Sequence, residues 1–135
     1  MIFIDTSAIV AVLLKEQEAA SITEKIMVTK PCWTAPHVRL EACMVLSSRL
    51  DISPADAEKG FNKFLHQTEI MVFDITDHIA HLAVIAFAKY GKGCGHPAQL
   101  NLADCLSYAC AKAHNVPILF KGRDFSHTDL EIVEY

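Results

Sequence analysis

Four acidic side chains fall where the chain leaves an expected strand or enters an expected helix: Asp5, Glu41, Asp104 and Asp124. Asp5 directly follows a short apolar run, and Asp124 follows another such run by a few residues. Glu41 and Asp104 lie in the first turns of helical segments. Carboxylate oxygens are the hard ligands that Mg²⁺ and Mn²⁺ prefer. An ion held by these acids would lower the pKa of a bound water and stabilise charge on a phosphodiester, so the pattern indicates metal-dependent hydrolysis.

Each acid also has an ordinary structural interpretation. Asp5 is equally a turn residue or helix cap at a strand end, and Glu41 is equally an exposed helix acid. Asp104 is equally an acid that interacts with a helix dipole. The neighbours of Glu41 and Asp104 are mostly apolar or small, which is unusual for a solvated face, and a buried carboxylate without a partner is costly. Asp124 lies in a Gly-x-Asp sequence that is common in turns, and Asp129 competes with it for the same role.

The segments that would position these acids alternate between short β-prone runs and longer helical stretches. This pattern predicts an α/β fold with a parallel sheet and helices on both faces. We expect strands at 2–4, 32–35, 70–73 and 117–120, with 130–133 as a candidate for a last one. The main helices are expected at 36–50, 77–90 and from Asn101 or Leu102 to 114. Ligands of open α/β sheets bind outside the carboxyl ends of the strands, so all four acids can reach one edge.

Polar residues mark where two of the helices begin. Thr6 or Ser7 can cap a helix that begins near Ala8. Ser21 and Glu24 have the spacing of a capping box, which predicts a second short helix that runs to about residue 28.

Composition bounds the class of protein. The chain has 135 residues, of which 52% are hydrophobic and 21% charged, as expected for one globular domain. Its formal net charge is 12 − 16 = −4, whereas nucleic-acid binders are usually basic. Setting the four acids aside leaves 12 − 12 = 0, and bound Mg²⁺ would make the site locally positive. A nucleic-acid substrate therefore stays compatible with the charge.

Cysteine usage and the apolar runs bear on the cellular location of the protein and on its candidate partner surfaces. The five cysteines are odd in number and form no C-x-x-C pair, which favours neither a zinc site nor a disulfide framework. The longest apolar runs, 8–14 and 82–88, are too short to span a bilayer, and they exceed what one small core requires. Either run is a candidate dimer or partner surface. No basic stretch precedes the N-terminal apolar residues, so we expect no signal peptide and a cytoplasmic location.

Four motifs together resemble those of the PIN-domain family, especially the VapC-type toxins of bacterial toxin–antitoxin pairs. The motifs are MIFIDTSA at 1–8, APHVRLEA at 35–42, HPAQLNLADCLSYA at 96–109 and PILFKGRDFSHTD at 117–129. Each motif alone is weakly specific, but all four occur in the family's order over nearly the whole chain.

The resemblance implies a single three-layer α/β/α PIN domain over 1–135 with a central parallel sheet. It implies an endoribonuclease that depends on Mg²⁺ or Mn²⁺, and the toxin role in a VapBC-type pair. A homodimer and an antitoxin that places a peptide over the active site are the implied partners. The family's catalytic and metal-binding quartet carries over to Asp5, Glu41, Asp104 and Asp124. The supporting positions are Thr6 or Ser7, as the hydroxyl after the first Asp, and Asn101, as a cap for Asp104.

Other interpretations remain at this stage. A phosphatase or dehalogenase with a nucleophilic Asp5 requires a second Asp two residues later, where this chain has Ser7. A receiver domain requires an acidic pair near the first strand, and only Lys121 fits its pattern. A PIN-like module that binds RNA or protein without cleaving it is the non-enzymatic alternative. Arg39, Lys121 and Arg123 lie near the acids in sequence and are equally phosphate ligands or solvated charges.

Overall fold

The computed structural model describes all 135 residues and contains one four-stranded sheet. The strands are β1 (Ile2–Ile4), β2 (Cys32–Thr34), β3 (Ile70–Val72) and β4 (Ile118–Leu119). They lie in the order β3-β2-β1-β4 and every pairing is parallel. The predicted central parallel sheet is therefore confirmed, with β1 as expected and the other three strands one or two residues shorter than expected.

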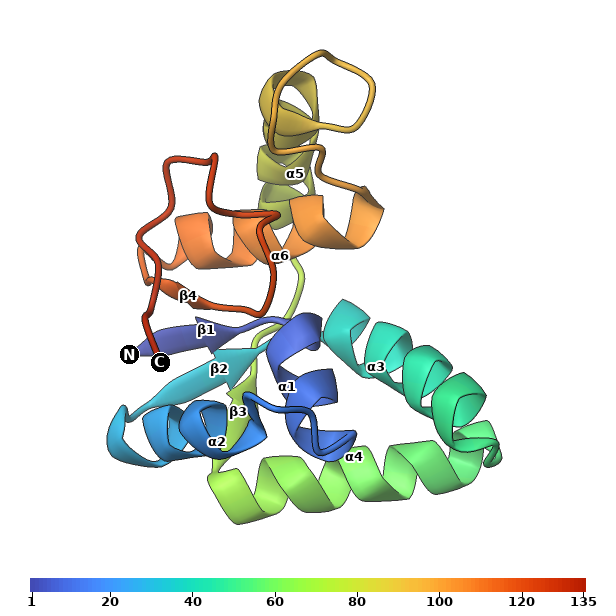
Figure 1. The fold of residues 1–135 in the computed structure, drawn as a ribbon. Helices are drawn as coiled ribbons and strands as arrows, with labels where there is room; N and C mark the ends of the chain where they lie inside the picture. The colour runs from blue at the N-terminus through green and yellow to red at the C-terminus, as the bar shows by residue number, and fades with distance from the viewer.

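Six helices connect the strands and cover the sheet. They are α1 (Thr6–Leu13), α2 (Ala19–Val28), α3 (Pro36–Leu50), α4 (Pro54–Thr68), α5 (Asp77–Tyr90) and α6 (Leu102–Ala113). Helices α1 to α4 connect strands that step from β1 to β3, whereas α5 and α6 return the chain to β4 on the other side of β1. Right-handed crossovers then place α1–α4 on one face and α5 and α6 on the other. The predicted three-layer α/β/α architecture is confirmed (Figure 1).

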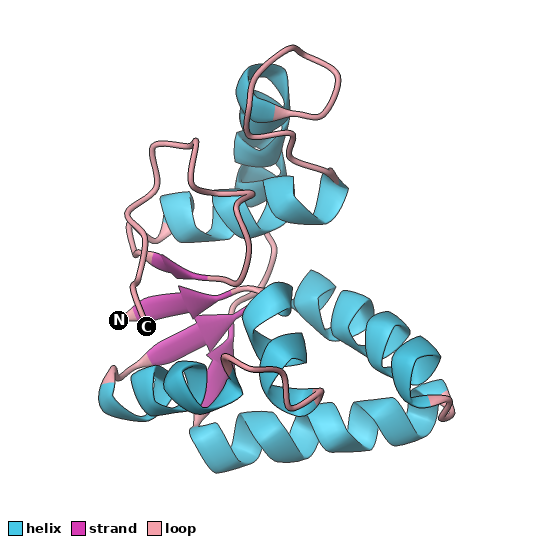
Figure 2. Cartoon of the chain, viewed as in Figure 1, coloured by secondary structure: helices cyan, strands magenta, loops and turns pink.

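All four strands point the same way, which gives the sheet one carboxyl edge. The strand arrowheads in Figure 2 point toward the start of α1. The first residues after β1, β2 and β4 therefore emerge at this edge, and α1 and α3 begin there. The backbone N–H of Asp5 donates to Leu119 O at 3.0 Å and continues the pairing of β1 with β4 to the edge itself.

The start of α1 differs from the prediction. The helix begins at Thr6, and its N-cap is Asp5, whose side chain accepts a hydrogen bond from Ser7 N at 3.1 Å. Neither Thr6 nor Ser7 is the cap. Asp5 directly follows β1 and caps α1, so both elements fix its position.

The predicted Ser21–Glu24 capping box is wrong. Helix α2 begins at Ala19, and its N-cap Glu18 makes no capping hydrogen bond with its side chain. The Ser21 hydroxyl lies within the helix and donates to Glu18 O at 3.0 Å, a common alternative for serine near a helix start.

The candidate strand at 130–133 is also wrong. This segment makes a single parallel bridge between Ile118 and Ile132. Strand β4 has only two residues, so it supports just two hydrogen bonds on that side, Ile118 N to Glu131 O and Val133 N to Ile118 O, each 2.9 Å.

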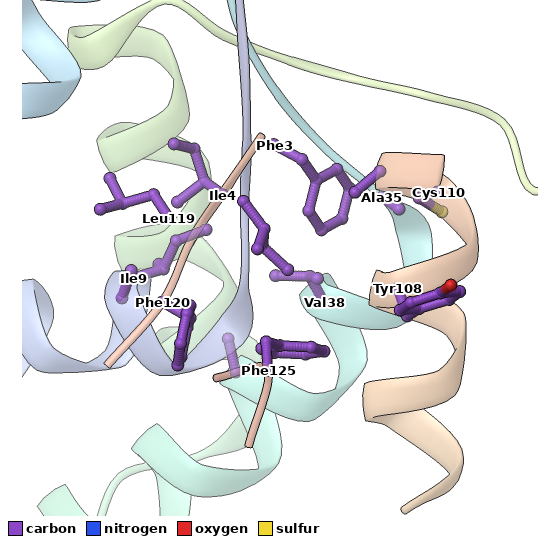
Figure 3. Packing of buried hydrophobic residues seen from close by; sticks show 14 of the residues in the cluster. Phe3, Ile4, Ile9, Ala35, Val38, Tyr108, Cys110, Leu119, Phe120 and Phe125 are labelled. Carbon is purple, nitrogen blue, oxygen red and sulfur yellow. The ribbon is translucent and has the colours of Figure 1, made fainter. Parts of the chain in front are cut away.

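The core is a single cluster of 37 buried hydrophobic residues. Figure 3 shows side chains of β1, α3, α6 and the segment after β4 meeting within it. Phe3 and Ile4 of β1 are fully buried, as both faces of a covered parallel sheet require. The apolar run 8–14 is largely absorbed by this core, whereas the run 82–88 leaves Val84, Ile85 and Phe87 more than half exposed. None of the helices has the length and apolarity of a membrane span.

Candidate active site

Asp5 is the most firmly held of the four acids. It is 5% exposed, and its Oδ2 accepts two hydrogen bonds from Ser7, at 3.1 Å from the backbone N–H and 2.7 Å from the hydroxyl. The Ser7 hydroxyl in turn accepts a hydrogen bond from Lys121 N at 3.0 Å. This relay ties Asp5 to the segment after β4 and leaves its Oδ1 without a protein partner.

Asp104 lies in the first turn of α6 and is held by the capping box that begins the helix. Asn101 Oδ1 accepts from Asp104 N at 2.8 Å, and Asp104 Oδ2 accepts from Asn101 N at 3.1 Å. The predicted role of Asn101 as the cap is confirmed by this geometry. Like Asp5, Asp104 is anchored through Oδ2 and keeps Oδ1 without a protein partner.

Glu41 lies in the second turn of α3 and is partly buried. Burial raises its pKa, the nearby Thr6 hydroxyl lowers it, and the charges of Asp5 and Asp124 raise it again. The net direction is upward. Glu41 is therefore not the ordinary exposed helix acid, because its carboxyl lies in the field of two other members of the quartet.

Asp124 is the most exposed member and lies in the loop after β4. Its neighbour Phe125 is fully buried and packs edge-on against Phe120 with ring centroids 5.1 Å apart, which anchors the loop. Partial burial and the charge of Asp5 raise the pKa of Asp124. The competing acid, Asp129, is instead engaged by the Tyr108 hydroxyl at 2.5 Å and Lys112 Nζ at 2.7 Å.

The pKa shifts indicate that the four predicted acids lie within each other's electrostatic reach. Burial raises the pKa of Asp104 to about 7, the Asn101 N–H opposes this shift, and Asp5, Asp124 and Glu41 all add to it. Carboxylates affect one another in this way only when they lie close together in a region of limited solvent. The effects of the other three acids on the pKa of Asp104 agree with the sequence prediction that these residues lie near one edge of the sheet.

Two of the three nearby cations are occupied. Arg39 contacts Glu58 at 3.3 Å and Asn62 of α4, and its guanidinium lies over the Phe61 ring. Lys121 pairs with Glu16 and Glu18 in the segment after α1.

Arg123, which adjoins Asp124, is exposed and makes no ion pair. It is the one of the three cations that is free to meet a phosphate.

Two side chains near the cluster escaped the sequence prediction. His37 Nε2 lies 2.8 Å from Ser107 Oγ. Burial lowers the pKa of His37 by more than the charge of Asp5 raises it. Their spacing was the available signal, because His37 precedes Glu41 by four residues and Ser107 follows Asp104 by three. Each pair therefore shares one helix face.

Comparison with known proteins identifies the family. A model of the PIN domain matches residues 2–131. The chain belongs to the PIN-domain family, in agreement with the resemblance in its four motifs.

Curated relatives narrow the similarity to one branch. The chain is 38% identical over 128 residues to ribonuclease VapC28 of Mycobacterium tuberculosis, covering 95% of this chain and 94% of that protein. It is 35% identical to a VapC ribonuclease of Rhizobium meliloti, covering 96% and 99% of the two chains. These similarities span nearly the full length of each protein.

Solved structures show the same fold. VapC20 of M. tuberculosis, a toxin described as cleaving the sarcin–ricin loop, superposes with a TM-score of 0.79 at 18% identity and covers 100% of both chains. A toxin–antitoxin complex from Klebsiella pneumoniae gives a TM-score of 0.74 at 17% identity, covering 100% of this chain and 98% of that one. At these low sequence identities, the two solved structures show a shared fold and nothing further.

Ribonucleases of this family generally depend on a divalent metal ion. The donor set fits such an ion, because Asp5 and Asp104 each keep an Oδ1 without a protein partner. Thr6 Oγ1 is buried beside the cluster and makes no hydrogen bond. No three acidic, histidine or cysteine side chains are close enough together to form a complete set of ligands.

Proposed function

We propose that the chain is an endoribonuclease that hydrolyses RNA phosphodiesters with Mg²⁺ or Mn²⁺ held by Asp5, Glu41, Asp104 and Asp124. One observation carries the proposal: four acids from four separate segments come close enough at the carboxyl edge of the sheet that Asp5, Asp124 and Glu41 all raise the pKa of Asp104. This edge is where open α/β sheets bind ligands. In a family of VapC ribonucleases, such a cluster is the expected centre of the reaction.

The bound ion would lower the pKa of a water molecule and neutralise charge on the phosphate. Asp5 and Asp104 would hold the ion through their free Oδ1 atoms, while Ser7 and Asn101 hold the Oδ2 atoms in place. In addition to its place among the ligands of the ion, Glu41 would orient the attacking water and accept its proton, a role that suits a carboxylate with a raised pKa. The water oxygen would bond to phosphorus as the P–O bond to the leaving nucleotide breaks, and the leaving oxygen would take up a proton from solvent.

The negative net charge is compatible with this substrate. Four of the sixteen acids are assigned to the metal site, which leaves the rest of the chain neutral. Arg123 is placed to contact a phosphate of the RNA beside the site, since no carboxylate engages it.

We further propose that the chain is a single PIN domain acting in the cytoplasm as the toxin of a VapBC-type pair, restrained by a VapB-type antitoxin. Its relatives are named VapC ribonucleases, and one similar structure is a toxin–antitoxin complex. The same fold in VapBC2 of Rickettsia felis was solved on a promoter DNA fragment, at 15% identity and a TM-score of 0.68.

We propose that a homodimer forms through the apolar face of α5 and α6. A groove of about 470 Å³ between them is lined mainly by hydrophobic side chains, and Phe87 and Leu102 on this face are 57% and 79% exposed. Exposed patches of this kind mark association surfaces. Size-exclusion chromatography with light scattering should give a dimer for the intact chain and a monomer for Phe87→Glu. A monomeric intact chain would refute the dimer.

Metal binding and cleavage test the catalytic proposal together. Calorimetry with Mn²⁺ should detect binding by the intact chain and a marked loss in Asp5→Asn and Asp104→Asn. RNA cleavage should require Mg²⁺ or Mn²⁺, stop with chelator and fall in the same variants. The control is Asp51→Asn, because Asp51 is exposed, caps the C-terminal end of α3 whereas Glu41 lies near its start, and has a left-handed backbone that Asn adopts readily. An intact chain that neither binds metal nor cuts RNA would refute the proposal.

A further inference from the structure

One hydrogen bond joins the two helices that carry Glu41 and Asp104. His37 Nε2, at the second position of α3, lies 2.8 Å from Ser107 Oγ of α6. It is the only side-chain hydrogen bond or ion pair between these helices. Ser107 is fully buried, so water does not compete for this bond.

The spacing along each helix places this bond directly beside the acidic pair. His37 and Glu41 are four residues apart on α3, and Asp104 and Ser107 are three apart on α6. Residues with these spacings are neighbours on one helix face. The hydrogen bond and the two acids are therefore neighbours on these helix faces, and the charge of Glu41 contributes to raising the pKa of Asp104.

The His37–Ser107 hydrogen bond opposes the electrostatic repulsion between Glu41 and Asp104. Two carboxylates in a region of limited solvent push their helices apart when no cation lies between them. His37 Nδ1 is buried without a partner, so Ser107 is the only hydrogen-bond anchor of the imidazole. No other polar bond between α3 and α6 would hold the spacing if this one were lost.

We propose that the His37–Ser107 hydrogen bond positions Glu41 and Asp104 by fixing the separation of α3 and α6, and so sets the affinity of the site for its divalent ion. This inference rests on the proposed metal-dependent function. His37 and Ser107 are positioning residues and act through the two acids.

The test is the Mn²⁺ dissociation constant of Ser107→Ala, measured by calorimetry. Loss of an outer-shell hydrogen bond typically weakens metal affinity by about 10-fold to 100-fold, and we expect a change on this scale. At limiting Mn²⁺ the kcat for RNA should fall while KM stays constant, and added Mn²⁺ should restore kcat. His37→Phe keeps the ring and should behave alike. The double variant should be no weaker than either single variant, because both remove the same bond.

Thr68→Val is the matched control. Thr68 is 5% exposed, its hydroxyl donates to Phe64 O at 2.7 Å, and it lies at the end of α4, away from the carboxyl edge. The control should lose comparable stability and keep its Mn²⁺ affinity.

Three outcomes separate the claims. An intact chain that binds no Mn²⁺ refutes the proposed function itself. Equal Mn²⁺ affinities for the intact chain and for Ser107→Ala would overturn the positioning role alone. Equal loss of affinity in Thr68→Val would also overturn it, because the effect would then be general loosening. If Ser107→Ala does not fold, His37→Phe provides the same measurement.

Discussion

The acidic site has two halves that the fold holds in different ways. On the strand side, Asp5 is bonded through its backbone to Leu119 and through its carboxylate to Ser7. On the helix side, Glu41 and Asp104 project from two helices that a single side-chain hydrogen bond joins. The strand half therefore inherits its geometry from the sheet, whereas the helix half depends on how α3 and α6 pack.

This difference assigns different tasks to the two halves. A carboxylate fixed by the sheet keeps its position whether or not an ion is bound. The helix half also carries an electrostatic cost, since burial raises the pKa of Glu41 and raises that of Asp104 to about 7. A cation relieves that cost. The comparison predicts that changes to the strand half mainly remove activity, whereas changes to the helix half also alter stability and metal affinity.

The largest effect is expected for Asp5→Asn on the strand side. Asn caps helices as well as Asp does, so the fold should persist while an anionic ligand is lost. We expect kcat/KM for RNA cleavage to fall by about 10²–10³-fold, the scale for losing one group that stabilises transition-state charge. Steady-state kinetics beside Asp51→Asn measures it. Activity equal to that of Asp51→Asn would show that the strand half does not hold the ion.

A smaller loss is expected for Ser7→Ala, which breaks the relay from Lys121 N to Asp5. Asp5 keeps the Ser7 backbone N–H but gains rotational freedom, so kcat/KM should fall by about 10-fold. The matched control is Ser21→Ala, which removes an exposed hydroxyl bonded to Glu18 O in α2. Indistinguishable kinetics for the two variants would mean that the sheet alone positions Asp5.

The placement of the acids on their elements was the part of the site most readily predicted from sequence. A short apolar run followed by Asp5 indicates a strand end, and in a parallel sheet all such ends share one edge. The Asn101 cap and the helix that carries Asp104 were equally readable, because a capping box is a local pattern. Local rules failed where two elements compete, as at Asp5, which ends β1 and caps α1.

The contacts that complete the site could not be predicted from sequence, because they join distant segments. Ser7 meets Lys121 after 114 residues, and His37 meets Ser107 after 70. The engagement of Arg39 by α4 likewise depends on helix packing. Residue type and spacing identify candidates for such pairs, but the partner is decided by the three-dimensional arrangement.

When metal is removed, the helix half should have a measurable effect on the thermal stability of the protein. Asp104 has a pKa of about 7 when folded and a reference value of 3.8, so the folded state holds its proton more tightly. Stability of the intact chain should fall as pH rises from about 4 to about 7 and the penalty should remain above that. Asp104→Asn lacks the penalty and can still accept the Asn101 N–H. In chelator at pH 8 its melting temperature should exceed that of the intact chain by roughly 3–6 °C.

The control for this measurement is pH itself. At pH 4.5 the folded carboxyl of Asp104 is already neutral, so the advantage of Asp104→Asn should nearly vanish. A variant that melts below the intact chain at pH 8 would show that helix-dipole and capping interactions outweigh the repulsion within the cluster.

The smallest effect is expected from Arg123, which lies beyond both halves. It adjoins Asp124, is exposed and has no ion-pair partner, whereas Arg39 is held by Glu58 and Asn62. Arg123→Gln should raise KM for RNA a few-fold and reduce the slope of log affinity against log salt by about 0.7–0.9, one phosphate contact. Arg39→Gln should leave that slope unchanged and lower the melting temperature slightly, because its charge stabilises the α3–α4 packing. A reversed pattern would mean that RNA displaces the contacts between Arg39 and α4 and approaches the site from the helix half.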